Sequence, residues 1–132
     1  MTADDFFRSV IGTPWANGAN GPEAYDCWGL VRAYYNEVRG IYLPVVNVDA
    51  TRAVAVAHAF AGNAALGDWE HLEFPVEGSA LLMGQARRPH HVGLWLGGGV
   101  LHSIEGAGVV YHCGPQLRLT GWNVLGFYGL RR

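Results

Sequence analysis

The sequence is poor in charge and has no excess of basic residues. Of its 132 residues, 15% are charged, and nine Lys and Arg against eleven Asp and Glu give a formal net charge of −2. Binding of nucleic acid without sequence preference needs a basic face, which this balance does not supply, so we expect no nucleic-acid partner. Half of the residues are hydrophobic. That content predicts one globular domain over residues 1–132.

Long apolar runs and an export signal are also missing. No apolar run approaches the ~20 residues that a membrane-spanning helix needs. The first five residues are acidic and lack the basic and apolar regions of a secretory signal peptide. The sequence therefore predicts a protein made in the cytoplasm, without a signal peptide and without a membrane span.

Cysteine is scarce: the sequence contains two, Cys27 and Cys113. One disulfide between them is the simplest alternative. Without an export signal, however, we expect a reducing compartment, in which thiols stay free. Cys113 is then predicted to be a small buried residue at a strand end.

Cys27 is predicted to open a helix. Asp26 is typical of a helix N-cap rather than a catalytic acid, and Gly40 is a stop signal after about Arg39. The unpaired N–H groups and the positive dipole end of the first turn favour thiolate over thiol. Apolar residues recur between these limits at helical spacing: Trp28, Leu30, Val31, Tyr34, Tyr35 and Val38.

The rest of the chain changes from helical to strand patterns along its length. A short amphipathic helix is predicted at 4–11, a turn-rich loop at 12–25, an extended segment at 41–48 and another helix at 51–61. Short β-type runs follow at 72–74, 80–83, 92–96, 100–104, 109–113 and 124–128. Helices first and strands afterwards predict an α+β fold with an antiparallel sheet packed on the cysteine helix.

Two histidines flank a predicted hairpin. If Gly97-Gly98 forms a two-residue turn, Leu96 lies opposite Gly99, and His91 and His102 become diagonal neighbours on one face. Their Cβ atoms would then be about 7 Å apart or somewhat less. Gly93 lies between them and has no side chain to obstruct their contact.

These groups suit nucleophilic catalysis on a carbonyl. Cys27 would attack as thiolate, His91 would act as general base and then acid, and His102 would orient the imidazole of His91. The Cys27 N–H is the first candidate donor to an oxyanion. Five neighbouring residues are weaker candidates for shaping the oxyanion pocket or the substrate groove: Trp15, Asn17, Tyr25, Asp26 and Trp28.

A zinc site is the competing interpretation of the histidines. It would draw on His90, His91, His102, His112 and Cys113. Their spacings match no standard zinc-ligand pattern, so we expect no metal and no cofactor.

The chain resembles the NlpC family of bacterial cell-wall cysteine peptidases. The resemblance runs through Ile11–Trp15, Asp26–Val31, His91–Gly97 and Leu101–Ser103. It implies a papain-like α+β fold, with Cys27, His91 and His102 as nucleophile, base and orienting residue. It also implies hydrolysis of an amide in peptidoglycan stem peptides, commonly between D-glutamate and diaminopimelate.

Trp28 follows the nucleophile where many members of that family carry serine. This residue, the compact size and the segments 101–103 and 106–110 are similar to a branch found in tailed phages and gene-transfer particles. That branch implies tail-tip or hub proteins as partners, and incorporation into a virion or phage-like tail. Gly78-Ser79 and the loop Trp15–Gly18 depart from the family pattern.

Two other functions remain open from the sequence. One is a structural tail-tip or tail-assembly protein that retains the fold and the site with little or no hydrolysis. The other is a thiol amidase or acyltransferase on another γ-glutamyl or lipid substrate, because the same three residues serve several acyl-transfer reactions.

Overall fold

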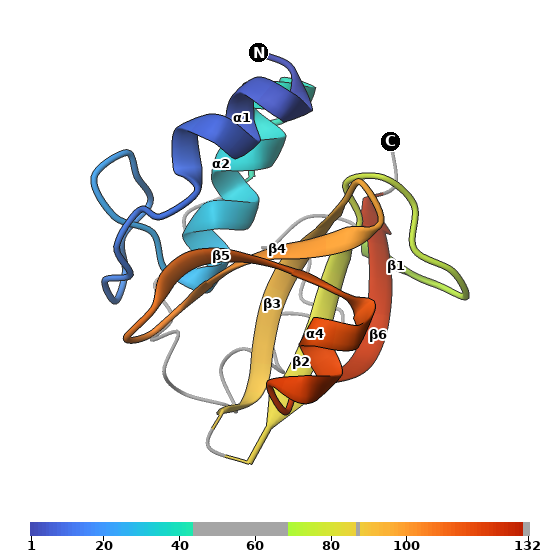
Figure 1. Cartoon of the computed structure of the whole chain (residues 1–132). Coiled ribbons are helices and arrows are strands. Elements are labelled where there is room, and N and C mark those ends of the chain that lie inside the picture. Colours follow the sequence, from blue (N-terminus) through green and yellow to red (C-terminus); the bar gives the residue numbers. More distant parts are fainter. Residues whose placement is uncertain (44–68, 87, 131–132) are drawn as a thin grey trace.

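The computed structural model describes residues 1–43, 69–86 and 88–130. Two helices come first, α1 (Ala3–Val10) and α2 (Cys27–Arg39), and six strands form most of the remainder (Figure 1). The strands are β1 (Trp69–Leu72), β2 (Ala80–Gln85), β3 (Arg88–Leu96), β4 (Gly99–Ile104), β5 (Gly108–Cys113) and β6 (Asn123–Leu130). A short helix, α4 (Gly114–Leu119), joins β5 to β6.

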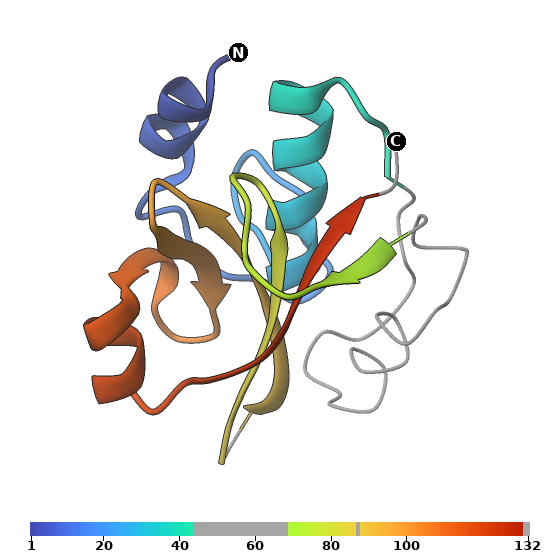
Figure 2. The same ribbon diagram turned by 90° about the vertical axis from the view of Figure 1, so that its right-hand side faces the viewer.

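The six strands form one sheet in the order β1-β6-β2-β3-β4-β5, and every neighbouring pair is antiparallel. Helices α1 and α2 lie side by side in both ribbon views (Figures 1 and 2). Alternating strand residues divide the core into two clusters. Val92, Leu94 and Leu101 pack with the two N-terminal helices. Strand residues on the other face of the sheet pack against α4 and the segment that follows it. This second core cluster contains Leu81, Met83 and Val100 of the strands, Leu117 of α4 and Trp122 of the following segment.

Helix α2 has the limits that the sequence predicts. The Asp26 side chain accepts a hydrogen bond from the backbone N–H of Gly29, which fixes the N-terminus. Gly40 ends the helix in the left-handed conformation with φ +67°, which glycine adopts without steric cost. The α+β class, the first helix and five of the six strands are likewise confirmed, with small shifts at their ends. The run predicted at 72–74 shares only Leu72 with β1, which begins earlier, at Trp69. The predicted helix at 51–61 and most of the extended segment at 41–48 lie outside the described residues.

Helix α4 was not predicted. Its six residues are too few to show helical periodicity, and its opening Gly114-Pro115 is typical of a turn. Proline is nevertheless well placed in a first helical turn, where its missing N–H costs nothing. The helix forms because Leu117 is buried in the second core cluster.

The hairpin between β3 and β4 has the predicted register. Leu96 pairs with Gly99, and Gly97 and Gly98 both have positive φ, +58° and +81°. These angles are what a two-residue turn needs when its twist matches that of the strands.

The prediction for Cys113 was half right. It ends strand β5, as expected, but it is exposed rather than buried. The reason is that β5 is an edge strand, and its last residue turns away from the core into α4. Both cysteines are free thiols, so the disulfide alternative does not describe this structure.

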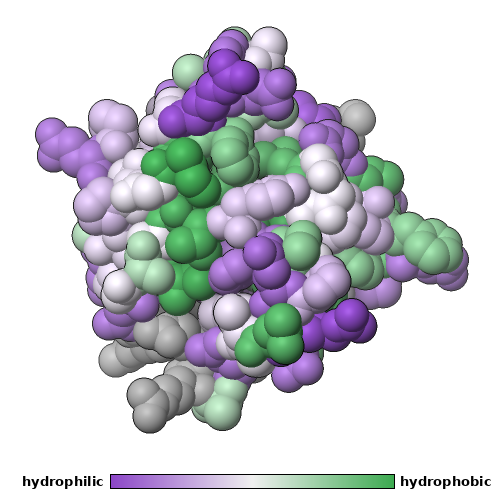
Figure 3. Space-filling view, in the orientation of Figure 1, coloured by the Kyte–Doolittle hydropathy of each residue, from purple (hydrophilic) through white to green (hydrophobic). Residues whose placement is uncertain are grey.

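The face that carries β5 mixes hydrophilic and hydrophobic residues. Figure 3 shows a narrow hydrophobic band on this face, with hydrophilic surface on both sides. Apolar residues are common on the surfaces of folded proteins, so this band by itself indicates no function. None of the helices in the described part of the chain is long and apolar enough to cross a membrane.

Candidate functional site

The start of α2 is tied to the loop that precedes it through the side chain of Asp26. Its carboxylate accepts hydrogen bonds from the backbone N–H groups of Gly29, at 2.6 Å, and Gly18, at 3.0 Å. Burial raises the pKa of Asp26, while the bonds from Gly29 and Gly18 lower it. The side chain is buried and committed to backbone donors. This confirms the predicted helix cap.

Gly29 is required by the same loop. A Cβ atom on Gly29 would lie 2.1 Å from the carbonyl oxygen of Ala19, a backbone atom. That oxygen already accepts the N–H of Asp26. The absence of a side chain at Gly29 therefore lets the loop close against the first turn of the nucleophile helix.

We expect Gly29→Ala to lower the free energy of unfolding by about 1–3 kcal/mol, as overpacking against fixed backbone does. Urea denaturation measures the change. Gly114→Ala is the matched control, since a Cβ there meets nothing within 4 Å and Gly114 has an ordinary φ. Equal stability of the two variants would contradict the proposed contact.

The sulfur of Cys27 lies among backbone donors but is cut off from solvent. Its residue is 2% exposed. The backbone N–H groups of Val92, Trp28 and Cys27 itself favour the charged sulfur and lower its pKa. Burial and the charge of Asp26 act in the other direction and raise the pKa of Cys27 to about 12. The N–H groups at the helix terminus thus favour the thiolate, as expected, but desolvation outweighs them in the resting site.

The start of α2 contacts both strands that carry the predicted histidines. Strands β3 and β4 pair from Leu96 opposite Gly99 to Leu94 opposite Leu101. Further along β3, the N–H of Val92 hydrogen-bonds the sulfur of Cys27. On β4, the hydroxyl of Ser103 donates to the carbonyl of Tyr25 at 2.7 Å. These contacts position Cys27 beside the backbone of Val92, the chain neighbour of His91.

His91 and His102 form a buried hydrogen-bonded pair. Nε2 of His91 lies 2.9 Å from Nδ1 of His102, and their residues are 5% and 0% exposed. Gly93 makes room for them, because a Cβ there would come within 3.1 Å of the Cβ of His102. The predicted shared face, and the role of Gly93 between the rings, are confirmed.

The sequence pattern of the NlpC/P60 family matches residues 12–114, a stretch that includes Cys27, His91 and His102. The chain belongs to the NlpC/P60 family. This confirms the family that the sequence motifs indicated.

A solved structure agrees with this assignment. The fold is similar to the crystal structure of the NlpC/p60 domain of peptidoglycan hydrolase SagA, with a TM-score of 0.61 and 21% sequence identity. The alignment covers 98% of this chain and 94% of the other. A search of curated proteins found no match. The papain-like α+β fold of an NlpC/P60 domain is thus established for this chain.

Trp122 also contacts the histidine pair, although its sequence context did not indicate this. Its indole stacks on the ring of His91, with centroids 4.7 Å apart and planes inclined by 27°. It also meets the ring of His102 edge-on at 5.6 Å. Trp122 lies on the segment between α4 and β6, far along the chain from either histidine. No local sequence signal indicates this contact.

His112 is a second residue that the analysis missed in this role. Its Nδ1 lies 2.9 Å from Nε2 of His102, which thus has an imidazole on each side. A signal was available: the hairpin of β4 and β5 pairs Val100 with His112, which makes His112 a diagonal neighbour of His102. The contact between His102 and His112 was therefore predictable from strand register alone.

The buried position of His102 has a consequence for stability. Desolvation, followed by the neighbouring His91 and His112, lowers the pKa of His102 from 6.5 to about 2. The folded protein therefore keeps this ring neutral at pH values where the unfolded chain protonates it. Because the unfolded state then binds more protons, stability falls as the pH drops below 6.5.

We expect the free energy of unfolding to gain a pH slope of up to about 1.4 kcal/mol per unit below that pH from this one group. Urea denaturation at pH 7 and pH 5 measures the difference. His102→Asn should flatten the slope, whereas the same change at the exposed His71 of β1 should leave it in place. Parallel pH profiles for both variants would contradict the assignment.

The weaker candidates have different positions. Tyr25 is buried, and its N–H and carbonyl are both used, by Pro14 and Ser103. The indole of Trp28 packs edge-on against Trp69 of β1, with centroids 6.3 Å apart. Trp15 is half-buried and Asn17 is exposed, both on the loop that Asp26 anchors. Their roles toward substrate remain predictions.

Within the described residues, no group of three or more His, Cys, Asp or Glu side chains could hold a metal ion. The histidines instead form a line in which His102 bonds a neighbour through each ring nitrogen. The side chain of His90, a candidate in the zinc alternative, lies outside the described part of the chain.

Proposed function

We propose that this NlpC/P60 domain is a cysteine peptidase that hydrolyses amide bonds in peptidoglycan stem peptides. The observation that supports it most is the hydrogen-bonded His91–His102 pair, presented beside the strand segment that contacts the sulfur of Cys27. A buried thiol, an imidazole and a group that orients the imidazole are the three components that thiol-dependent acyl transfer needs.

The reaction begins from neutral groups, since the raised pKa of Cys27 and the lowered pKa of His102 both oppose charge in the resting site. As the substrate carbonyl arrives, His91 takes the proton from Cys27 and the sulfur bonds to the carbonyl carbon. N–H groups at the start of α2 stabilise the oxyanion. The C–N bond then breaks, and His91 gives its proton to the departing amine.

Hydrolysis of the thioester completes the cycle. His91 takes a proton from water, the hydroxide adds to the acyl carbon, and the C–S bond breaks to release the carboxylic product. The sulfur recovers a proton from His91. Throughout, Nδ1 of His102 accepts the Nε2–H of His91, and the stacked Trp122 holds the plane of that ring.

Peptidoglycan is the substrate class supported by the family and by the name of the SagA structure, a peptidoglycan hydrolase. The bond we propose is that between D-glutamate and diaminopimelate. We also propose assembly with tail-tip or hub proteins of a phage-like tail. Trp28 after the nucleophile and the compact domain support this setting.

The test uses purified peptidoglycan that contains diaminopimelate. We expect the protein to release new amino termini, and mass spectrometry of the fragments should identify the cleaved bond. Cys27→Ala should release none, and Cys113→Ser, which removes the other free thiol, should retain activity. If the wild type and Cys27→Ala are equally inert, and Cys27→Ala blocks particle assembly, the protein is a structural tail component instead.

A further inference from the structure

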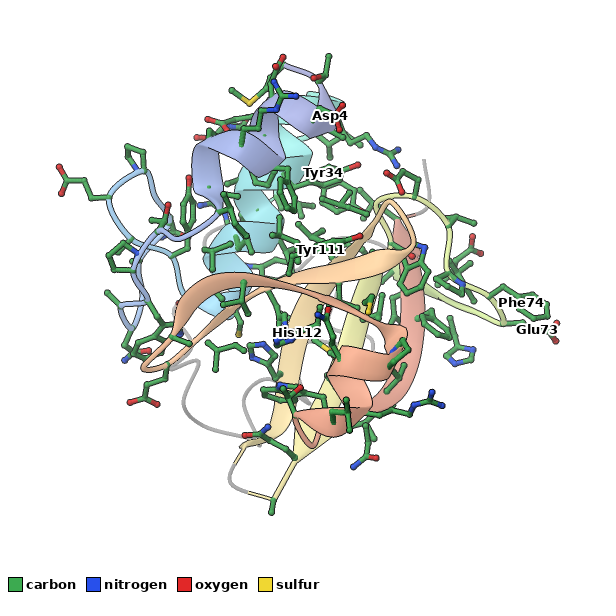
Figure 4. All side chains as sticks on the ribbon, viewed as in Figure 1. Asp4, Tyr34, Glu73, Phe74, Tyr111 and His112 are labelled. Atoms are coloured by element: carbon green, nitrogen blue, oxygen red, sulfur yellow. The ribbon has the colours of Figure 1, made fainter. Side chains whose placement is uncertain are left out.

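The chain of histidines continues beyond the pair that the proposed mechanism uses. His112 lies on β5 with its ring 5.1 Å, centroid to centroid, from that of His102. Its neighbour Tyr111 points the other way, to the ring of Phe7 on α1. Figure 4 shows the two labelled side chains on opposite sides of β5, with Tyr111 nearer the helices. His112 therefore belongs to the same side of the sheet as the His91–His102 pair.

The donors and acceptors of three linked imidazoles can be counted. A neutral imidazole has one N–H and one bare nitrogen, whereas an imidazolium has two N–H groups. When His91 holds the catalytic proton, its Nε2 carries hydrogen, so Nδ1 of His102 must be bare to accept it. The hydrogen of His102 is then on Nε2, and it must be donated to Nδ1 of His112.

The opposite direction fails. If His112 donated through Nδ1, then Nε2 of His102 would be the acceptor and its hydrogen would move to Nδ1. That hydrogen would face the Nε2–H of a protonated His91 across 2.9 Å. Loss of that hydrogen would remove the conflict, but it would leave His102 as a charged ring. Burial opposes such a charge, because His102 is fully buried. A proton on His91 is therefore compatible with one direction of donation, from His91 to His102 and from His102 to His112.

We propose that His112 is a positioning residue, whose Nδ1 accepts the Nε2–H of His102 and so fixes His102 as the tautomer that accepts from His91. The inference rests on the proposed function, since it concerns the state in which His91 has taken the proton of Cys27. His112 itself touches neither substrate nor sulfur; it acts through His102.

Two substitutions test the acceptor specifically. Asparagine places its Oδ1 near the position of histidine Nδ1, whereas leucine has a similar size and no acceptor. We expect His112→Leu to lower kcat for amine release by about 10-fold or more with little change in KM, and His112→Asn to remain within about 3-fold of the wild type. His71→Leu, on the edge strand β1, controls for loss of a histidine.

A measurement without substrate separates this inference from the proposed function. Long-range ¹H–¹⁵N correlation spectra distinguish the protonated ring nitrogen of each histidine, and His102→Asn assigns the signals of His102. We expect His102 to carry its hydrogen on Nε2 in the wild type and in His112→Asn, and to populate both tautomers in His112→Leu.

Hydrogen on Nδ1 of His102 in the wild type would overturn the inference. So would a His112→Leu variant with the kcat of the wild type, or a His112→Asn variant as impaired as His112→Leu. If the protein hydrolyses no peptidoglycan, the proposed function fails while the tautomer result still decides the role of His112. Unfolding temperatures show whether each His112 variant retains the fold. If neither variant does, the tautomer of His102 in the wild-type spectrum still decides the inference.

Discussion

His91→Ala is expected to lower kcat for amine release on the order of 10³-fold or more, with the fold retained. His91 transfers the proton in both halves of the proposed reaction, and removal of a general base that also serves as acid carries a loss of this size. The neutral resting thiol makes the dependence stronger, because burial raises the pKa of Cys27 to about 12 and it cannot ionise without a partner. Amine release from peptidoglycan under single-turnover conditions measures the chemical step.

A mutant cycle with His102 tests whether the two residues act as a unit. His102→Leu removes the acceptor of the His91 Nε2–H and should reduce kcat by about 10²-fold, whereas His102→Asn, with Oδ1 near the position of Nδ1, should recover most of the loss. In the background of His91→Ala, His102→Leu should cost nothing more. Independent, additive losses would mean that His102 does not act through His91.

Trp122→Ala is expected to lower the free energy of unfolding by about 3–5 kcal/mol, the usual cost of truncating a buried aromatic residue. Trp122 is 3% exposed and central to the second core cluster, with Leu81, Met83, Val100 and Leu117. Because its indole stacks on His91, kcat should fall even at temperatures where the variant remains folded. Urea denaturation and amine release measure the two effects.

Two comparisons make the result for Trp122 specific. Trp122→Phe retains an aromatic ring beside His91 and should recover most of kcat while losing less stability than the alanine variant. Phe74→Ala truncates an aromatic side chain that is 75% exposed and should be nearly neutral. Full activity of folded Trp122→Ala would mean that the stacking does not position His91.

The sequence by itself determined the elements that depend on neighbours along the chain. Asp26, the helical spacing after it and Gly40 set the limits of α2, because capping and periodicity act within one or two turns. Gly97-Gly98 set the hairpin, and strand alternation then placed His91 and His102 on one face. The family motifs lie in these same segments, so the fold class and the family could be predicted from the sequence, and both were confirmed.

Tertiary structure alone decided what depends on contacts between distant segments. Whether Cys27 is charged depends on how much water the surrounding core excludes, and that burial reversed the effect expected from the helix terminus. Trp122 meets His91 because α4 returns the chain across the sheet, and Gly29 is constrained by the carbonyl of Ala19, which the fold of the preceding loop brings against α2. Packing and desolvation are properties of the assembled core, so a local pattern cannot contain them.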